Sequence, residues 1–174
     1  MGTDHYAQSK QLRKGRWSAP GQIYLLTSAT WRRRPVFADQ ALGQVLVEAM
    51  NYPGFRGQTE SLVFVVRPDH FHWLLALGKG MTMAKIMASL KSDSSHRIKS
   101  MAGDRFAVGP LWQEGYHDHA LRQEDVRQVA QYVAANPWRA DLVQKLAEYP
   151  LWGGIYQEEF AGLCLQAAHF RELE

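Results

Sequence analysis

Two histidines separated by one residue are the clearest candidates for chemistry in the sequence. His70 and His72 open a hydrophobic run that ends at Leu77. Alternate side chains of a β-strand share a face, so both imidazoles lie on one side, with Cα atoms roughly 7 Å apart. Converging imidazoles at that spacing can bind one divalent metal ion. The alternative interpretation is two polar residues at the end of a strand.

Tyr132 and Asn136 form a second pair, on a helix predicted over residues 124–137. Tyr132 lies about 130° from the centre of the hydrophobic stripe of this helix, and Asn136 lies about 40° from Tyr132, one turn later. Pro137 disfavours helical geometry at the preceding residue, so we expect Asn136 at the helix end. A phenol and an amide thus share one edge, although an amphipathic surface tyrosine is the alternative. The stripe consists of Val126, Val129, Ala130, Val133 and Ala134.

His117 and His119 repeat the spacing of the first histidine pair. They fall in a strand predicted over residues 111–121, with Asp118 between them. Because no further residue supports them, they rank second as a metal-binding pair.

Charge is unevenly distributed along the chain. Residues 1–34 carry seven bases and one acid, a net charge of +6, whereas the remainder carries thirteen bases and sixteen acids, a net charge of −3. A basic end on a faintly acidic body suggests a polyanion bound near the amino terminus, with solvated surface charge as the alternative. Arg16 and Trp17 combine a base with an aromatic ring, which suits stacking on an unpaired base beside phosphate contacts. Trp17 could equally cover the first strand.

Length and composition predict one domain. The chain has 174 residues, of which 46% are hydrophobic, enough for one adequate core. We expect a flexible tail over residues 1–14, the domain over 15–156 and a helical tail over 157–174. A single cysteine excludes an internal disulfide and fits a reducing compartment. Neither a signal peptide nor a membrane span is recognisable, so a cytoplasmic protein without membrane contact is expected.

The order of the predicted elements indicates an α+β fold. Strand, helix, two-stranded hairpin, helix and strand follow one another, which is the βαββαβ order of a ferredoxin-like antiparallel sheet sandwich. Right-handed crossovers place the first and third strands in the middle of the sheet. The helix that carries Tyr132 is added after this unit. The predicted elements are strand 23–30, a helix capped by Asp39, strand 62–67, a strand from 70 to 77, helix 83–101 and strand 111–121.

Several short motifs, taken together, resemble the REP-associated tyrosine transposases. These belong to the HUH single-strand endonucleases and are related to single-tyrosine insertion-sequence transposases. The resemblance covers residues 15–156, and residues 1–12 and 157–174 lie outside it. The matching segments are Gly15 to Ser18 with Pro20-Gly21, Arg67 to Trp73, Lys91-Ser92, Leu111 to Arg122, and Tyr132 to Pro137.

The resemblance implies a catalytic site. Tyr132 becomes the nucleophile, and His70, His72 and Asn136 become the protein ligands of Mg²⁺ or Mn²⁺. Attack on a phosphodiester would leave a 5′-phosphotyrosine link and a free 3′-hydroxyl. Because Mg²⁺ does not normally choose imidazole, Mn²⁺ is a serious candidate.

The resemblance also suggests the substrate, namely single-stranded or hairpin DNA of repetitive extragenic palindromes. A tetranucleotide at the foot of the hairpin would be read by residues 15–18. One tyrosine permits one covalent attachment per site, so the protein could act as a monomer or a homodimer. The expected DNA-binding residues are Arg13, Lys14, Gly15, Arg16, Trp17, Ser18, Lys91 and Arg97.

Two other functions remain open at this point. A catalytically idle ferredoxin-like protein that binds single-stranded nucleic acid would explain the basic end, but it leaves the histidines and Tyr132 unused. A metal-dependent phosphodiesterase that activates water would use the histidines but not the tyrosine.

Overall fold

The computed structural model describes residues 19–51 and 58–161. The flexible tail predicted for residues 1–14 lies outside the described residues. Of the predicted helical tail only Gln157–Ala161 is described, and it forms helix α5. The remainder of that prediction falls outside these ranges.

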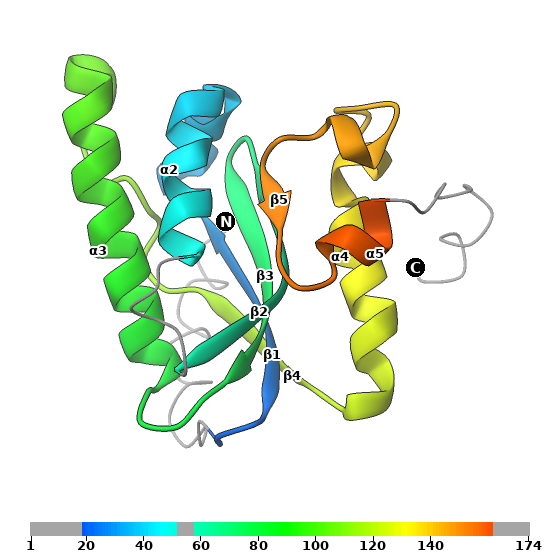
Figure 1. The fold of residues 1–174 in the computed structure, drawn as a ribbon. Helices are drawn as coiled ribbons and strands as arrows, with labels where there is room; N and C mark the ends of the chain where they lie inside the picture. Colours follow the sequence, from blue (N-terminus) through cyan, green and yellow to red (C-terminus); the bar gives the residue numbers. More distant parts are fainter. Residues whose placement is uncertain (1–18, 52–57, 162–174) are drawn as a thin grey trace, which may run out of the picture.

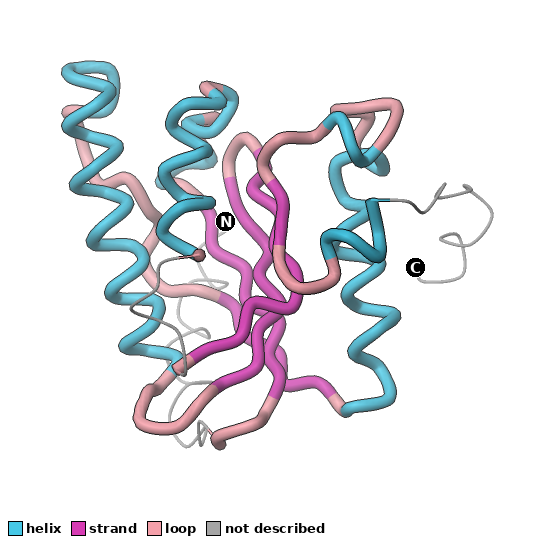
Figure 2. Tube along the Cα trace, in the orientation of Figure 1, coloured by secondary structure: helices cyan, strands magenta, loops and turns pink. Residues whose placement is uncertain are grey.

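Five antiparallel strands form one sheet, in the order β4-β1-β3-β2-β5 (Figures 1 and 2). Strands β1 and β3 occupy the middle of the four predicted strands, which confirms the ferredoxin-like arrangement. The strands are β1 (Ile23–Ala29), β2 (Thr59–Arg67), β3 (His70–Leu77), β4 (His117–Leu121) and β5 (Trp152–Gly153).

Helices cover both faces of the sheet. Figure 1 shows α2 (Gln40–Met50) and α3 (Met83–Ala102) on one face and α4 (Val126–Arg139) with α5 on the other. Asp39 begins α2 as predicted, because its carboxylate accepts a hydrogen bond from the Ala41 amide at 3.1 Å and thereby satisfies a free amide of the first turn.

Successive side chains of β3 point to opposite faces of the sheet and so contribute to two hydrophobic cores. Phe71, Trp73, Leu75 and Leu77 pack beneath α2 and α3. Leu74 faces the opposite way and packs with the buried side of α4. The two histidines share the face of Leu74, so the face that carries them is covered by α4.

Three predicted features needed correction. The fourth strand begins at His117 rather than Leu111, because Gly115 turns the chain with a φ of 78°. Helix α4 continues through Pro137 to Arg139, so Asn136 lies inside the helix rather than at its end. The short strand β5 was not predicted, and it pairs with β2 through Phe64 and Val65.

Among the described residues, no helix combines the length and the apolar character needed to cross a bilayer.

Candidate active site

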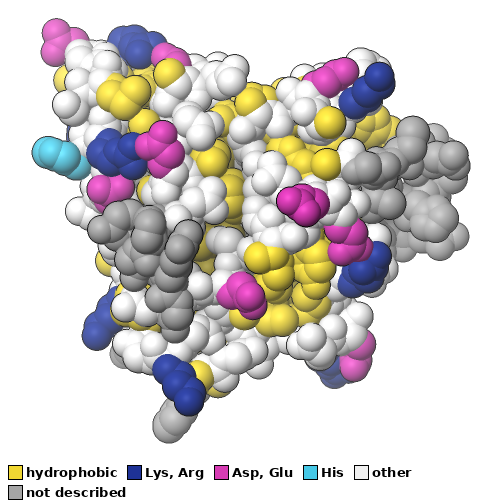
Figure 3. Space-filling view, in the orientation of Figure 1, with side chains coloured by type: hydrophobic (Ala, Val, Ile, Leu, Met, Phe, Trp, Pro, Cys, Tyr) yellow, Lys and Arg dark blue, Asp and Glu magenta, His cyan; other side chains and the backbone are white. Residues whose placement is uncertain are grey.

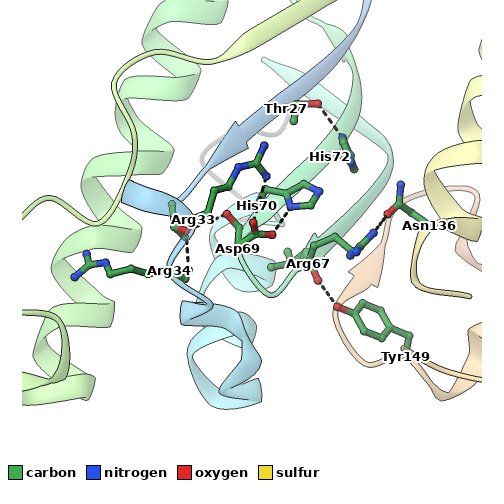
Figure 4. A network of polar contacts seen from close by, with 11 residues as sticks. Thr27, Arg33, Arg34, Arg67, Asp69, His70, His72, Asn136 and Tyr149 are labelled. Atoms are coloured by element: carbon green, nitrogen blue, oxygen red, sulfur yellow. Dashed lines mark hydrogen bonds and ion pairs between the residues drawn. The ribbon is translucent and has the colours of Figure 1, made fainter. Parts of the chain in front are cut away.

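A tight turn brings the two histidines onto the face of the sheet that α4 covers. Pro68 and Asp69 connect β2 to β3, and Arg67 pairs with His70 across the turn. Figure 4 shows both imidazoles beside the end of this hairpin. Their ring centroids are 4.9 Å apart and their planes are nearly perpendicular. The rings are therefore close enough to contact one ion.

Each imidazole is held through its Nδ1 atom. His70 Nδ1 lies 2.5 Å from a carboxylate oxygen of Asp69, and His72 Nδ1 lies 2.8 Å from Thr27 Oγ1. An ionised carboxylate only accepts hydrogen bonds, so Nδ1 of His70 carries the proton and its Nε2 presents a lone pair. Such contacts fix the tautomer and orientation of metal-binding histidines. Neither Nε2 has a hydrogen-bond partner among the described residues.

Burial keeps both imidazoles neutral at neutral pH. It lowers the pKa of His72 to about 4, and the positive charge of Arg67 acts in the same direction. Burial also lowers the pKa of His70, although its hydrogen bond to Asp69 opposes this effect. A neutral imidazole is the form that binds a metal ion.

Arg33, the last residue of a short 3-10 helix that follows β1, supports this arrangement. Its guanidinium lies 3.3 Å from the Asp69 carboxylate. The backbone of Arg33 adopts a φ of 55°, in the left-handed region, which costs about 1 kcal/mol or more for a residue other than glycine. Burial raises the pKa of Asp69, but its contacts with His70 and Arg33 outweigh this effect and leave the pKa below its ordinary value.

Asn136 faces the same site from α4. Only 7% of its surface is exposed, so its amide requires partners inside the protein. Its Oδ1 atom accepts a hydrogen bond from Nη1 of Arg67, the last residue of β2 (Figure 4). This hydrogen bond connects the end of β2 to α4 at Asn136, the residue predicted to bind the metal ion.

Tyr132 lies one helical turn before Asn136 and is half-buried at the edge of the core beneath α4. The guanidinium of Arg139 lies 4.6 Å from the centre of its ring. Tyr149 is a second tyrosine near Arg67 (Figure 4), but its hydroxyl donates to the Val66 carbonyl at 2.5 Å. Burial raises the pKa of Tyr149 to about 12. Tyr149 is therefore the poorer nucleophile.

The donor set suits a divalent metal ion. Among the described residues, no three His, Cys, Asp or Glu side chains gather in a way that could hold one. The candidate set instead has two imidazoles and one amide, His70, His72 and Asn136. The two neutral rings with free Nε2 atoms fit such an ion, and the Asn136 oxygen keeps a second lone pair beside its bond to Arg67.

The other histidine pair stands apart from this set. His117 and His119 are exposed on the edge strand β4. Thr27 pairs with His72 on one side and with His117 on the other, so these two histidines are about 10 Å apart across the sheet. Among the described residues, no further His, Cys, Asp or Glu side chain joins His117 and His119 in a group that could hold a metal ion.

The predicted DNA-binding residues Arg13, Lys14, Gly15, Arg16, Trp17 and Ser18 lie outside the described residues. Lys91 lines a groove of about 700 Å³ between α3 and residues 110–115, and neither His70 nor His72 is part of its lining. Its ammonium group donates to the carbonyls of Gln113 and Gly115. Arg97 forms ion pairs with Glu48 and Asp93. Both side chains are therefore held by contacts within the protein.

Sequence reasoning missed four side chains that support the site. Arg67 and Asp69 stand directly before His70 in the sequence, and this proximity was the available signal. Thr27 and Arg33 come from β1 and the segment after it, more than thirty residues away. Only the register of β1 against β3 reveals them.

Comparisons with known proteins point to a transposase family. The model of the IS200-like transposase family matches residues 20–136. A REP-associated tyrosine transposase bound to a REP hairpin superposes with a TM-score of 0.62 at 22% identity, covering 79% of each chain. A putative transposase from Deinococcus radiodurans R1 gives a TM-score of 0.48 at 24% identity, covering 70% of this chain and 95% of its own.

The fold also resembles, at lower sequence identity, that of a bacterial tRNA(His) guanylyltransferase-like protein in complex with ATP. The TM-score is 0.50 at 10% identity, and the match covers 84% of this chain and 69% of the other. No curated protein shows significant similarity. The similarity to the REP-associated structure concerns the fold, whereas the family model matches well over half of this chain, a range that includes His70, His72, Tyr132 and Asn136. The chain therefore belongs to the IS200-like transposase family.

Proposed function

We propose that the protein cleaves and transfers single-stranded DNA through a covalent link to Tyr132. The observation that carries this proposal is that two neutral imidazoles, each with a free Nε2, lie on the sheet face that α4 covers, where Arg67 connects the end of the same hairpin to Asn136, one helical turn after Tyr132. This combination supplies both a nucleophile and a site for the phosphate's charge. Membership of a transposase family supports the same reaction.

The reaction exchanges one phosphodiester bond for another. The Tyr132 oxygen loses its proton and forms a bond to phosphorus, and the bond from phosphorus to the 3′ oxygen breaks. The 3′ oxygen leaves with the electron pair and takes up a proton, giving a free 3′-hydroxyl and a 5′-phosphotyrosine. The bond energy is kept in the new ester, so a second 3′-hydroxyl can reverse the step on another strand.

His70, His72 and Asn136 would hold Mg²⁺ or Mn²⁺, with Mn²⁺ favoured by the two imidazoles. When bound, the ion would polarise the scissile phosphate. Asp69 and Thr27 keep the two imidazoles oriented through Nδ1. Helix α4, which carries Tyr132 and Asn136, packs on the sheet face that bears both histidines, and this packing supports the proposal.

The proposed substrate is hairpin DNA of repetitive extragenic palindromes. The solved relative of the same fold was bound to a REP hairpin, and the basic amino-terminal segment with Trp17 suits unpaired nucleotides. One tyrosine gives one attachment per site, so a complete transfer requires two protomers or two successive events.

The test is adduct formation. Labelled hairpin DNA is incubated with the protein and Mn²⁺, then separated on a denaturing gel. We expect a covalent DNA adduct with the unmodified chain and no adduct or cleavage with Tyr132→Phe, which loses one hydroxyl at a half-buried position and keeps DNA binding.

Tyr149→Phe is the matched variant, because it removes a second phenol near the same site without removing the proposed nucleophile. We expect it to retain the adduct. Undiminished cleavage by Tyr132→Phe would overturn the assignment and favour a phosphodiesterase that uses water. Binding without cleavage by the unmodified chain would favour an idle nucleic-acid-binding protein.

A further inference from the structure

Arg67 occupies an unusual place for a charged residue. It ends β2 and pairs with His70 across the turn, so their Cα atoms are about 5 Å apart and both side chains leave the same face of the sheet. Its guanidinium reaches Asn136 on α4 (Figure 4). Because Asn136 follows Tyr132 by about 6 Å along the helix axis, Arg67 lies between the imidazoles and the helix that carries the proposed nucleophile.

The guanidinium is only partly satisfied by the protein. One Nη1 hydrogen bond goes to Asn136, whereas the buried Nε atom has no hydrogen-bond partner. Five other arginines form ion pairs with carboxylates, and Arg67 forms none with an Asp or Glu of the described residues. A half-buried cation without a counter-ion is costly, so an anion from outside the chain would compensate it. The five paired arginines are Arg33, Arg97, Arg105, Arg122 and Arg127.

The chemistry of the guanidinium selects the anion. Its planar donors match two oxygens of a phosphate, and such charge-assisted pairs are stronger than neutral hydrogen bonds. Asn136 would orient the group by holding Nη1, which leaves Nη2 and the second Nη1 hydrogen for a ligand. A phosphodiester placed for attack by Tyr132 would lie in this same space.

We propose that Arg67 binds a non-bridging oxygen of the scissile phosphate and stabilises the negative charge that develops there during attack. The inference rests on the proposed function and adds a residue to it. A purely structural Arg67 would only tie β2 to α4 through Asn136. The two roles differ in one respect: only in the proposed role does Arg67 interact with the negative charge of the scissile phosphate.

The first measurement is the rate of adduct formation at saturating hairpin DNA. Loss of one donor to a developing oxyanion typically costs about 10²- to 10³-fold, so we expect a loss of that size in Arg67→Met. Arg67→Lys keeps the charge but not the planar donors, and its loss should be smaller. Arg127→Met is the matched control on the outer surface of α4, where Arg127 pairs with Glu159, and it should stay within about twofold of the unmodified chain.

The second measurement is binding without turnover, in the Tyr132→Phe background. A hairpin with a neutral methylphosphonate at the scissile position is compared with the ordinary hairpin. The methylphosphonate should weaken hairpin binding about tenfold or more when Arg67 is present. In the protein that also carries Arg67→Met, it should weaken binding by less than about twofold. Thermal unfolding of each variant reports whether it folds; if Arg67→Met does not, Arg67→Lys takes its place in the comparison and should show an intermediate penalty.

The outcomes separate this inference from the proposed function. An adduct formed equally fast by the unmodified chain and by Arg67→Met overturns the role of Arg67 alone. The same follows if the methylphosphonate penalty is equal with and without Arg67, which leaves Arg67 as a link between sheet and helix. Failure of the unmodified chain to form any adduct overturns the proposed function, and this inference with it.

Discussion

At the scale of single residues, the two imidazoles depend on the groups that hold their Nδ1 atoms. The Asp69 carboxylate and the Thr27 hydroxyl fix how His70 and His72 face the site. In proteins that bind metal ions, loss of such partners lowers metal affinity about 10- to 100-fold. The supporting contacts therefore give a test of the metal site that does not remove its ligands.

We predict that Asp69→Asn and Thr27→Val each weaken Mn²⁺ binding about 10- to 100-fold while the fold is kept. Binding is measured by calorimetry without DNA. Asp104→Asn removes an exposed carboxylate after α3 and should leave the affinity unchanged. Equal Mn²⁺ affinity in all four proteins would mean that His70 and His72 are not the metal ligands.

The partly buried His72 also predicts how stability depends on pH. Its folded pKa of about 4 lies below the ordinary histidine value of 6.5, so the unfolded chain binds more protons between these values. The free energy of unfolding should then fall, by about 1–3 kcal/mol, as the pH drops from 6.5 towards 4. Urea unfolding across this range measures the slope.

His72→Gln should flatten this pH dependence because it removes the titrating ring. His119→Gln, on exposed β4, is the control and should retain the slope. If the two variants show the same slope as the unmodified chain, another group causes the acid lability.

Much of the candidate site could be predicted from residue spacing alone. The spacing of His70 and His72 placed both rings on one face because the strand period is two, and the structure places them together. Thr27 and Arg33 could not be found this way, since their proximity depends on which strands pair and in which register. Arg67 lies three residues before His70 in the sequence, but only the packing of α4 shows that its side chain reaches Asn136.

At the scale of secondary-structure elements, local patterns predicted the helices and long strands well, and they failed where the wider fold overrides a local preference. Helix α4 passes through Pro137, which is buried, and ends two residues later at Arg139, so the cost of the proline falls only on the last turn. The strand β5 has two residues, too few for any periodicity. It forms because β2 offers an open edge.

The segment after β5 depends on a glycine. Gly154 has a φ of 116°, and a Cβ atom there would lie 2.5 Å from the Leu62 carbonyl oxygen and 2.7 Å from Val63 Cα. Both contacts are with backbone, which cannot move aside as a flexible side chain can. The position therefore combines an unfavourable φ with a steric clash.

We predict that Gly154→Ala lowers the free energy of unfolding by at least about 2 kcal/mol. Gly80→Ala is the matched control, because Gly80 also has a positive φ of 83° but no atom within 4 Å of the position that a Cβ would take. It should cost about 1 kcal/mol, from backbone strain alone. Urea unfolding of both variants measures the difference, and equal losses would show that the clash at Gly154 is relieved without cost.

At the scale of the whole molecule, charge and chemistry are separated along the chain. In the face shown in Figure 3, the described Lys and Arg side chains are scattered among Asp and Glu. Of the net charge of +6 on residues 1–34, residues 1–18 carry +3, from four bases and one acid. Strand β1 pairs Ile23 with Ala76, Thr27 with His72 and Ala29 with His70, so the chain enters the sheet about 13 Å from His72 and about 20 Å from His70.

This separation predicts that deleting residues 1–18 weakens DNA binding without removing the chemistry. Four bases are lost, Lys10, Arg13, Lys14 and Arg16. If all four contact phosphates of single-stranded DNA, the slope of log affinity against log salt concentration should flatten by about 3. Trp17→Ala alone should cost about tenfold in affinity or more, because stacking on an aromatic ring contributes roughly 1–3 kcal/mol per base.

The truncated protein should also discriminate less between hairpins that differ only in the foot tetranucleotide, yet still form the adduct at saturating DNA, because Tyr132, His70 and His72 remain in place. Affinities at several salt concentrations, measured for matched and altered hairpins, test binding and discrimination together, and a thermal melt checks the fold. If the truncated protein kept its full sequence preference, the tetranucleotide would have to be recognised by residues of the described part of the chain. Lys91 and Lys99 line the groove beside α3 and would then be the next residues to substitute. This groove combines two basic side chains with space for a nucleic-acid strand.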